Sequence, residues 1–281
     1  VYYAKVLKKD VPRAVELLSD ILTNSTFSQA AVERERDVIL REMEEVESIT
    51  EEVIFDMLHE CAYVGTPLAR TILGPVANIQ SISAEDIKTY INTHYTAPRM
   101  VFAASGAVEH DQVVGLCDQY FGGVPAEAPG GLTYEDTPSL FSGADVRDFN
   151  DDMPTAHFAL SFEGLKWTDP DIYSLMLCQS LLGTYDAKKT TAAFTSSKLA
   201  SDISKLDAGV QLMQPFCTCY TDTGLFGVYF EMNMAKKENV DDTIGTIQEE
   251  LVAMTTGVAD EDLVAAKAQL KYNMLMQMDG T

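Results

Sequence analysis

The feature that most constrains the fold is an internal repeat in the order of the expected elements. Residues 7–11 (LKKDV) lead into a helical pattern, a turn and a second, long helix that starts at Ser28. Residues 235–240 (AKKENV) lead into the same order, with the long helix starting at Asp260. Two copies of one supersecondary unit in 281 residues predict two related α/β domains, because a single core rarely grows to this size.

Hydrophobic periodicity predicts which segments are strands and which are helices. Strands are expected over residues 1–7, 100–106, 155–162, 210–220 and 224–234. Helices are expected from residue 12, over 28–47, from 50, from 83, over 111–121, 169–182 and 195–206, and from 240 and 260. Such a mixture is typical of an α+β chain.

A segment that is rich in proline and glycine separates the two copies. We predict a linker over residues 124–145, between a first domain at 1–123 and a second, incomplete domain at 146–281. The sequence starts at Val1 inside a strand pattern and stops at Thr281. We therefore expect the full protein to continue beyond both ends.

The charge of the chain narrows the classes of partner. Asp and Glu number 43 against 20 Lys and Arg, which gives a formal net charge of −23. Nucleic acid is excluded as a partner because phosphate contacts need a basic face, whereas a cationic ligand suits this chain. A plainer alternative is that the excess carboxylates only keep the protein soluble. There is no run of about 18 apolar residues that would predict a membrane-spanning helix.

The five cysteines lack the spacing of a metal site or a disulfide framework. Cys217 and Cys219 alternate in an expected strand, but two thiols do not make a zinc site without further ligands. We expect free thiols in a reducing compartment. The histidines at 59, 94, 110 and 157 are also scattered, and no second histidine lies four residues from any of them. Each is interpreted as an ordinary surface or core histidine.

Two carboxylates share one face of the long helix expected over residues 28–47. Glu35 and Glu42 are seven residues apart, which places them on the same side as Ile39 and Val46. Carboxylates on an apolar face suggest a site, but salt bridges to neighbouring arginines would also explain them. These arginines are Arg34, Arg36 and Arg41.

The second copy of the repeat lacks these carboxylates. With Ser28 laid on Asp260, Glu35 falls on Lys267 and Glu42 on Met274. The sequence therefore predicts that any chemistry belongs to the first copy. Glu52 and Asp56 follow on the next helix, one turn apart and so on one face, where they form either a binding pair or a solvated surface.

Residues 35–43 (ERDVILREM) resemble the later metal-ligand helix of the pitrilysin and insulysin class of zinc metallopeptidases. Within that class the chain is similar to the β subunits of mitochondrial processing peptidases. The same similarity is carried by residues 1–5 (VYYAK), 70–75 (RTILGP), 93–95 (THY) and 196–200 (SSKLA), and so extends along essentially the whole chain. The resemblance implies a pitrilysin-like fold of two homologous α/β sandwich domains. Each would have a mixed, mainly antiparallel sheet with helices on one face.

The resemblance also implies a zinc site that this sequence contains only in part. In that class, zinc is held by two histidines of an H-x-x-E-H helix and by one glutamate of a later helix. By position, Glu42 matches that third ligand and Glu35 an auxiliary glutamate. The H-x-x-E-H motif would precede Val1. Glu52 and Asp56 match the pair that receives an arginine of the presequence.

The partners that the resemblance implies are a processing-peptidase α subunit and cationic presequence peptides, in the mitochondrial matrix. No Gly-rich loop of the α type is visible here, which favours β. The alternative is a core subunit of respiratory complex III, paired with a second core subunit and attached through cytochrome b to the matrix side of the inner membrane. One chain could serve both roles. A free-standing oligopeptidase of the same class is a weaker third interpretation, because fold alone does not fix function.

Overall fold

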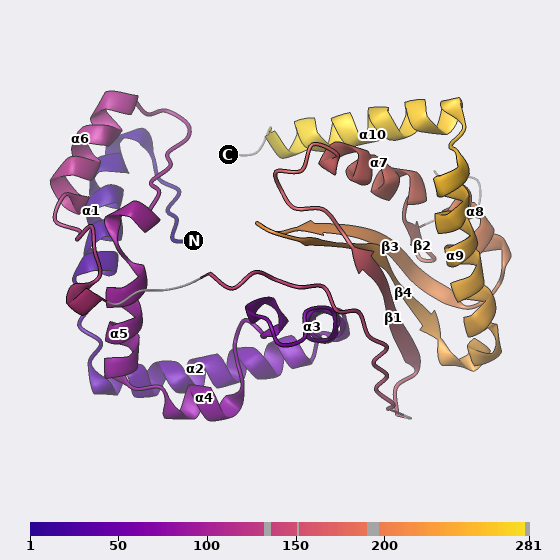
Figure 1. Ribbon diagram of the computed structural model, residues 1–281, viewed down its shortest axis with the longest axis horizontal. Helices are drawn as coiled ribbons and strands as arrows, with labels where there is room; N and C mark the ends of the chain where they lie inside the picture. The colour runs from indigo at the N-terminus through magenta and orange to yellow at the C-terminus, as the bar shows by residue number, and fades with distance from the viewer. Residues whose placement is uncertain (132–135, 151, 190–196, 279–281) are drawn as a thin grey trace. The chain divides into compact units, whose positions relative to one another are not determined.

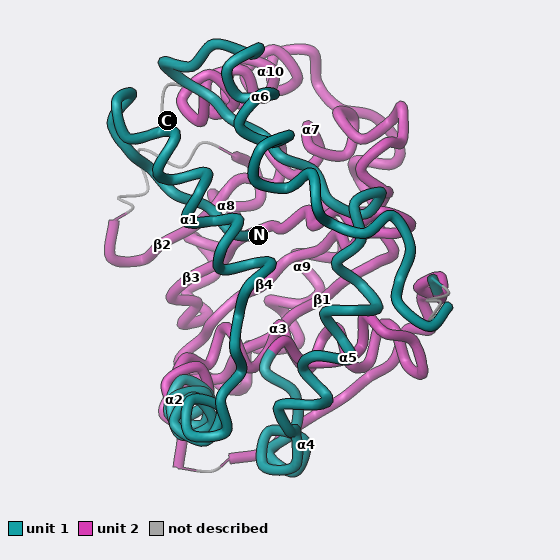
Figure 2. Tube along the Cα trace, turned by 90° about the vertical axis from the view of Figure 1, so that its left-hand side faces the viewer, with its two compact units in different colours: residues 1–44, 73–136, 281 teal, residues 45–72, 137–280 magenta. Residues whose placement is uncertain are grey.

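The computed structural model describes residues 1–131, 136–150, 152–189 and 197–278. Residues 132–135 of the expected linker and the first two residues of the helix expected over 195–206 lie outside these ranges. The chain forms two compact units, which Figure 2 shows in two colours. The first contains residues 1–44 and 73–136, and the second contains residues 45–72 and 137–280.

The described part of the first unit is helical. Its helices are α1 (Val11–Thr23), α2 (Gln29–Glu47, whose last three residues belong to the second unit), α4 (Val76–Ser81), α5 (Ala84–His94) and α6 (His110–Phe121), with short 3-10 helices η1 (Lys8–Asp10), η3 (Ala97–Arg99) and η4 (Pro129–Gly131). Pro12 stands at the start of α1, where its missing N–H costs nothing. Ser83 and Asp86 form a capping box at the start of α5.

Two strands that the sequence predicts in this unit are not present. Residues 1–7 and 100–106 contain no strand, and Val1 and Val101 are almost fully exposed. A strand is stable only when neighbouring strands take up its N–H and C=O groups. Within the described residues neither segment has such a neighbour, so their apolar pattern does not produce a sheet.

The second unit contains the sheet and the remaining helices (Figure 1). The helices are α3 (Thr50–Ala62), η2 (Pro67–Ala69), α7 (Ile172–Leu182), α8 (Lys198–Lys205), η6 (Met234–Asn239), α9 (Val240–Thr256) and α10 (Asp260–Met278). The expected repeat is visible as two runs of the same order: η1, α1 and α2 in the first copy, and η6, α9 and α10 in the second.

The sheet has four antiparallel strands in the order β1-β4-β3-β2. They are β1 (Thr155–Glu163), β2 (Tyr185–Asp186), β3 (Val210–Cys219) and β4 (Gly224–Asn233). Three of these confirm expected strands, and β2 is too short for its pattern to be recognised. Phe158 lies opposite Phe230 in the register, and their rings stack with centroids 4.6 Å apart. An α+β class with an antiparallel sheet is therefore confirmed for this part of the chain.

Helices cover both faces of the sheet, not one face as expected. On one side, α7, α8 and α9 pack on Val228, Phe230 and Met232 in the main core. On the other, Leu58 and Ala62 of α3 and the following Tyr63 pack on Leu225 of β4. Gly227 makes room on this second side, because a Cβ there would come within 2.1 Å of the Leu160 carbonyl oxygen and 2.7 Å of the Phe216 ring. Its missing side chain lets Phe216 lie over the sheet and contact α3.

Candidate functional site

Helix α2 exposes both of its expected site carboxylates. Glu35 and Glu42 are exposed, whereas Ile39 and Val46 on the same helix are half-buried. No residue of α2 is buried. The expectation that both carboxylates would share the environment of the apolar residues is therefore wrong, because no sheet covers that face within the described residues of the first unit. In the described part of the chain neither carboxylate forms an ion pair.

Two of the three arginines of α2, Arg36 and Arg41, donate to backbone carbonyl oxygens. The Arg36 guanidinium donates to the carbonyl oxygens of Ile79 and Ile82 at 2.8 Å each, at the C-terminal end of α4. Arg41 Nε donates to the Asp37 carbonyl oxygen at 3.1 Å. A cation is favourable at a helix C-terminus, where carbonyls lack partners. Arg36 thus fixes α2 to α4 and leaves Glu35 and Glu42 available to a ligand.

Helix α3 carries the second expected pair in the other unit. Glu52 is exposed and Asp56 is partly exposed, and neither has a hydrogen bond or ion pair among the described residues. At helical spacing Glu52, Asp56, His59 and Tyr63 form one stripe, with about one residue in each turn. The carboxylates occupy the first half of this stripe, and the second half contacts the sheet.

His59 joins α3 to the hairpin of β3 and β4. Its Nδ1 lies 2.7 Å from the Phe55 carbonyl oxygen, which can only accept, so Nδ1 donates and Nε2 can accept. The Tyr220 hydroxyl, just after β3, makes a short hydrogen bond with Nε2. Burial raises the pKa of Tyr220, which keeps the hydroxyl protonated as the donor. The sequence-based interpretation of His59 as an ordinary histidine missed this contact.

Tyr63 closes the C-terminal end of α3 against the same hairpin. It is fully buried, and its hydroxyl donates to the Gly224 carbonyl oxygen at 2.8 Å. A Cβ at Gly224 would come within 2.5 Å of the Leu165 carbonyl oxygen, so the hairpin tolerates only glycine there. Ser142 N–H donates to the Ala62 carbonyl oxygen at 2.8 Å, which satisfies one of the last carbonyls of α3.

A second hydrogen-bonded pair of a histidine and a tyrosine lies on the α3 side of the sheet. His157 Nδ1 lies 2.7 Å from the Tyr229 hydroxyl, and its Nε2 lies 3.1 Å from Thr155 Oγ1. Burial lowers the pKa of His157, although the nearby carboxylates of Glu231 and Glu51 oppose this shift. Burial also raises the pKa of Tyr229 to about 12. The His157 imidazole and the Tyr229 hydroxyl are therefore both neutral at pH 7, and they form a neutral hydrogen bond across β1 and β4.

The described residues do not form a complete metal site. They contain no group of three or more His, Cys, Asp or Glu side chains that could hold a metal ion. The five cysteines are free thiols. Burial, and to a smaller extent the neighbouring Cys219, raises the pKa of Cys217 to about 12. This thiol therefore stays protonated at neutral pH and is a poor metal ligand. An exposed carboxylate without an ion pair among the described residues, such as that of Glu42, can contribute one oxygen ligand to a metal ion.

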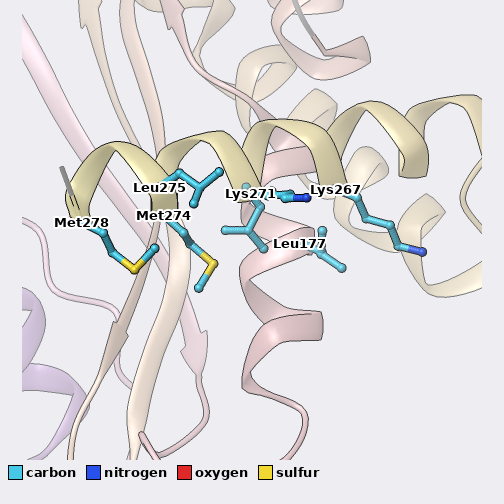
Figure 3. Close-up of a pocket in the computed structure, with 7 residues that line it drawn as sticks. Leu177, Lys267, Lys271, Met274, Leu275 and Met278 are labelled. Atoms are coloured by element: carbon cyan, nitrogen blue, oxygen red, sulfur yellow. The ribbon is translucent and has the colours of Figure 1, made fainter.

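A groove between α7 and α10 is lined by apolar side chains and two lysines (Figure 3). It encloses about 300 Å³ and is lined by Leu177 of α7 and by residues of α10 that include Lys267, Lys271 and Met274. Its lining residues include no carboxylate or histidine, and the polar groups they contribute are the ammonium groups of the two lysines. None of the described helices is both long and apolar enough to cross a membrane.

Two models of one peptidase family match the chain. The model "Insulinase (Peptidase family M16)" matches residues 1–76, and the model "Peptidase M16 inactive domain" matches residues 81–270. The first match contains α2 and α3 with all four expected site carboxylates, and the second contains the sheet.

Curated relatives match over the whole chain. The probable mitochondrial-processing peptidase subunit beta of Arabidopsis thaliana is 44% identical over 281 residues, and the subunits beta of Neurospora crassa and Homo sapiens are each 43% identical. All of this chain is covered in each case, but only 52%, 59% and 56% of the relatives. The chain therefore spans about half the length of the curated relatives it matches. The resemblance to processing-peptidase β subunits is confirmed.

One solved structure has the same fold. A chain in the structure of complex III2 from Candida albicans with Inz-5 bound superposes with a TM-score of 0.86 at 23% identity. The match covers 97% of this chain and 64% of that chain. At this identity the likeness shows the shared fold alone.

Proposed function

The chain belongs to peptidase family M16, and we propose that it is part of the catalytic β-type subunit of a zinc metalloendopeptidase that removes mitochondrial presequences. The observation that carries the proposal is its 43 to 44% identity to processing-peptidase β subunits along its whole length. The full protein would contain two homologous sandwich domains, with residues 1–123 in the first, 124–145 as the linker and 146–281 in the second. Its place would be the mitochondrial matrix.

In this proposal Glu42 is the zinc ligand that this chain supplies. Its carboxylate is exposed and has no ion pair among the described residues, as a metal ligand needs. Glu35, two turns before it on the same helix, would act as the auxiliary carboxylate that holds the site in place. Zinc, when bound, supplies Lewis-acid chemistry that makes water nucleophilic near neutral pH. The two histidine ligands and the general base would come from an H-x-x-E-H motif before Val1.

Glu52 and Asp56 would bind the arginine of the presequence. Two unpaired carboxylates one helical turn apart can accept both edges of a planar guanidinium. Replacing both residues with alanine should raise the KM of an arginine-containing presequence about 10- to 100-fold, as expected for lost charge-assisted hydrogen bonds. A presequence with alanine in place of that arginine should be cleaved as before. Equal losses on both peptides would contradict the arginine pair.

The direct test of the peptidase uses the full-length protein together with its α-type partner. We expect it to cleave a synthetic presequence and to lose this activity to a zinc chelator, with recovery on addition of zinc. Cleavage that persists after removal of all metal would contradict the proposal. So would the absence of cleavage in a zinc-loaded complex.

A second candidate is a core subunit of respiratory complex III, associated with a second core subunit and cytochrome b. The observation that favours it is the shared fold with a chain of the Candida albicans complex III2 structure. The presence of both carboxylate pairs favours the peptidase, because a scaffold has no use for them. Copurification with cytochrome b and no presequence cleavage would establish the scaffold, and both properties together would show one chain in both roles.

A further inference from the structure

The carboxylate pair of α3 is attached to the sheet of the second unit by a set of contacts that the proposed function does not use. We call His59, Tyr63, Tyr220 and Gly224 the α3 anchor. His59 lies on α3 and Tyr63 directly after it, whereas Tyr220 directly follows β3 and Gly224 begins β4, about 160 positions later in the sequence. The contacts therefore fix one short helix to a distant hairpin within the same unit.

His59 acts on the peptide group next to Asp56. Its Nδ1 bonds to the carbonyl oxygen of Phe55, and that carbonyl belongs to the peptide bond between Phe55 and Asp56. The other ring nitrogen bonds to the Tyr220 hydroxyl. One imidazole thus links the backbone beside Asp56 to the end of β3.

The ring of Phe55 fixes the same turn from the side of the sheet. It meets the Phe216 ring edge to face with centroids 5.0 Å apart, and it lies 5.9 Å from the Tyr229 ring. Such aromatic pairs are geometrically specific. Asp56 therefore follows directly on a residue whose side chain and carbonyl are both held by the second unit.

We propose that His59 and Tyr220 are positioning residues for substrate recognition, and that they set the place of the Glu52 and Asp56 carboxylates that bind the arginine of a cationic presequence. This inference rests on the proposed function. It assigns to the M16 "inactive domain" segment, which contains Tyr220, a part in selecting the substrate. A bidentate guanidinium contact depends on the direction of both carboxylates, so a small rotation of α3 weakens it.

The test is Tyr220→Phe in the full-length protein with its α-type partner. This change removes the hydroxyl that meets His59 and keeps the ring. We expect the KM for an arginine-containing presequence to rise about 3- to 10-fold, the range for one lost hydrogen bond, with kcat unchanged. The KM for the alanine-substituted presequence should not change. Tyr173→Phe, on the exposed side of α7, is the matched control and should change neither value.

Variants of His59 separate positioning from mere loss of structure. His59→Leu should reduce the preference for arginine as Tyr220→Phe does, whereas His59→Gln, whose amide can still reach Tyr220, should restore most of it. Hydrogen exchange of the α3 amides should be faster in Tyr220→Phe, with the amides of α9 unchanged. A variant that lowers kcat equally on both peptides would show a general structural role and overturn the inference.

A double-mutant cycle distinguishes this inference from the proposed function. If Tyr220 acts through the carboxylates, Tyr220→Phe should have no further effect once Glu52 and Asp56 are both alanine. If the Glu52 and Asp56 double variant keeps its preference for arginine, the arginine pair itself is wrong. If that double variant loses the preference while Tyr220→Phe retains it fully, the pair stands and the positioning role is overturned.

Discussion

Helices α2 and α10 have 19 residues each and occupy the same place in the two copies of the repeat, but they differ in what surrounds them. Because α2 begins at Gln29 and α10 at Asp260, the structure corrects the alignment of Ser28 with Asp260 by one residue. Glu35 therefore matches Ala266 and not Lys267, and Glu42 matches Asn273 and not Met274. Glu35 is exposed, whereas Ala266 is only 5% exposed and its carbonyl oxygen accepts from Ser180 Oγ of α7 at 3.4 Å. At the position of Glu35 the two helices therefore differ, because α2 exposes a carboxylate where α10 buries a small side chain, whereas Glu42 and Asn273 are both exposed.

This difference between the two copies has a simple energetic reason. A carboxylate at a buried helix–helix contact costs stability unless it is paired, so the packed copy has a small side chain there. The exposed copy carries no such penalty and can keep a charge for chemistry. The predictions below test this comparison, from the largest expected effect to the smallest.

The largest effect should come from Glu42→Gln in the full-length protein with its partner. Changing a residue that only supports a metal ligand typically costs about 10- to 100-fold, so loss of the ligand itself should lower presequence cleavage by more than ~100-fold. Glu35→Gln, at a residue that would only support the ligand, should lower presequence cleavage by about 10- to 100-fold. Glu261→Gln, an exposed carboxylate on α10, should leave the rate unchanged. If Glu42→Gln cleaved the presequence at the normal rate, Glu42 would not be a zinc ligand, and α2 would have no role in the chemistry that α10 lacks.

Placing a carboxylate at the matching position of α10 should affect stability instead of activity. Ala266→Glu would bury an unpaired charge and should destabilise the protein by about 3 kcal/mol. Ala268→Glu on the exposed side of the same helix, and Glu35→Ala on α2, should each change the free energy of unfolding by less than ~0.5 kcal/mol. Thermal unfolding would measure these changes. Equal effects of the Ala266 and Ala268 variants would show that α10 is not packed as described.

A pair of glycine variants compares the two faces of the sheet. Gly227→Ala would crowd the Phe216 ring and the Leu160 carbonyl under α3, so we expect a loss of about 1 to 3 kcal/mol. Gly245→Ala in α9 has open space around its Cβ and should instead stabilise the protein by about 0.5 to 1 kcal/mol through helix propensity. Chemical denaturation of both variants would check the signs, and two losses of similar size would contradict the described packing.

The smallest effect should be a pH dependence from His157. Because burial lowers its pKa below the ordinary 6.5, the unfolded chain takes up a proton at a higher pH than the folded chain does. Its contribution to stability is therefore complete above pH 6.5 and is lost as the pH falls below that value. His157→Gln should flatten the fall in stability on the acid side, whereas His110→Gln, at an exposed helix start, should not. If the free energy of unfolding of the wild type, His157→Gln and His110→Gln changed with pH in parallel, His157 would not be the source of the pH dependence.

Much of the second unit could be predicted from the sequence. Strands at 155–162, 210–220 and 224–234 are expected because short runs rich in apolar and aromatic residues, bounded by turn residues, are typical of buried strands. Residues 1–7 and 100–106 form no strand because, within the described residues, neither segment has a neighbouring strand with which to form a ladder. The periodicity of a segment indicates which of its faces is apolar, but not whether a neighbouring strand is present to pair with it.

The candidate site was only partly predictable for a related reason. The spacing of Glu35 with Glu42, and of Glu52 with Asp56, is local and can be read from one helix. The contact between His59 and Tyr220 is not local, because it joins positions 161 residues apart. The available signal was weak: His59 and Tyr63 continue the stripe of Glu52 and Asp56, and polar groups in such a place need partners.

The most direct test of the central claim, that α2 supplies the chemistry and α10 does not, is the zinc content of the full-length protein bound to its partner. Metal analysis after gel filtration should find about one zinc per heterodimer in the wild type and in Glu261→Gln, and much less in Glu42→Gln, with all three equally folded. Equal zinc in all three proteins would show that Glu42 is not a ligand and would contradict the assignment of the site to α2.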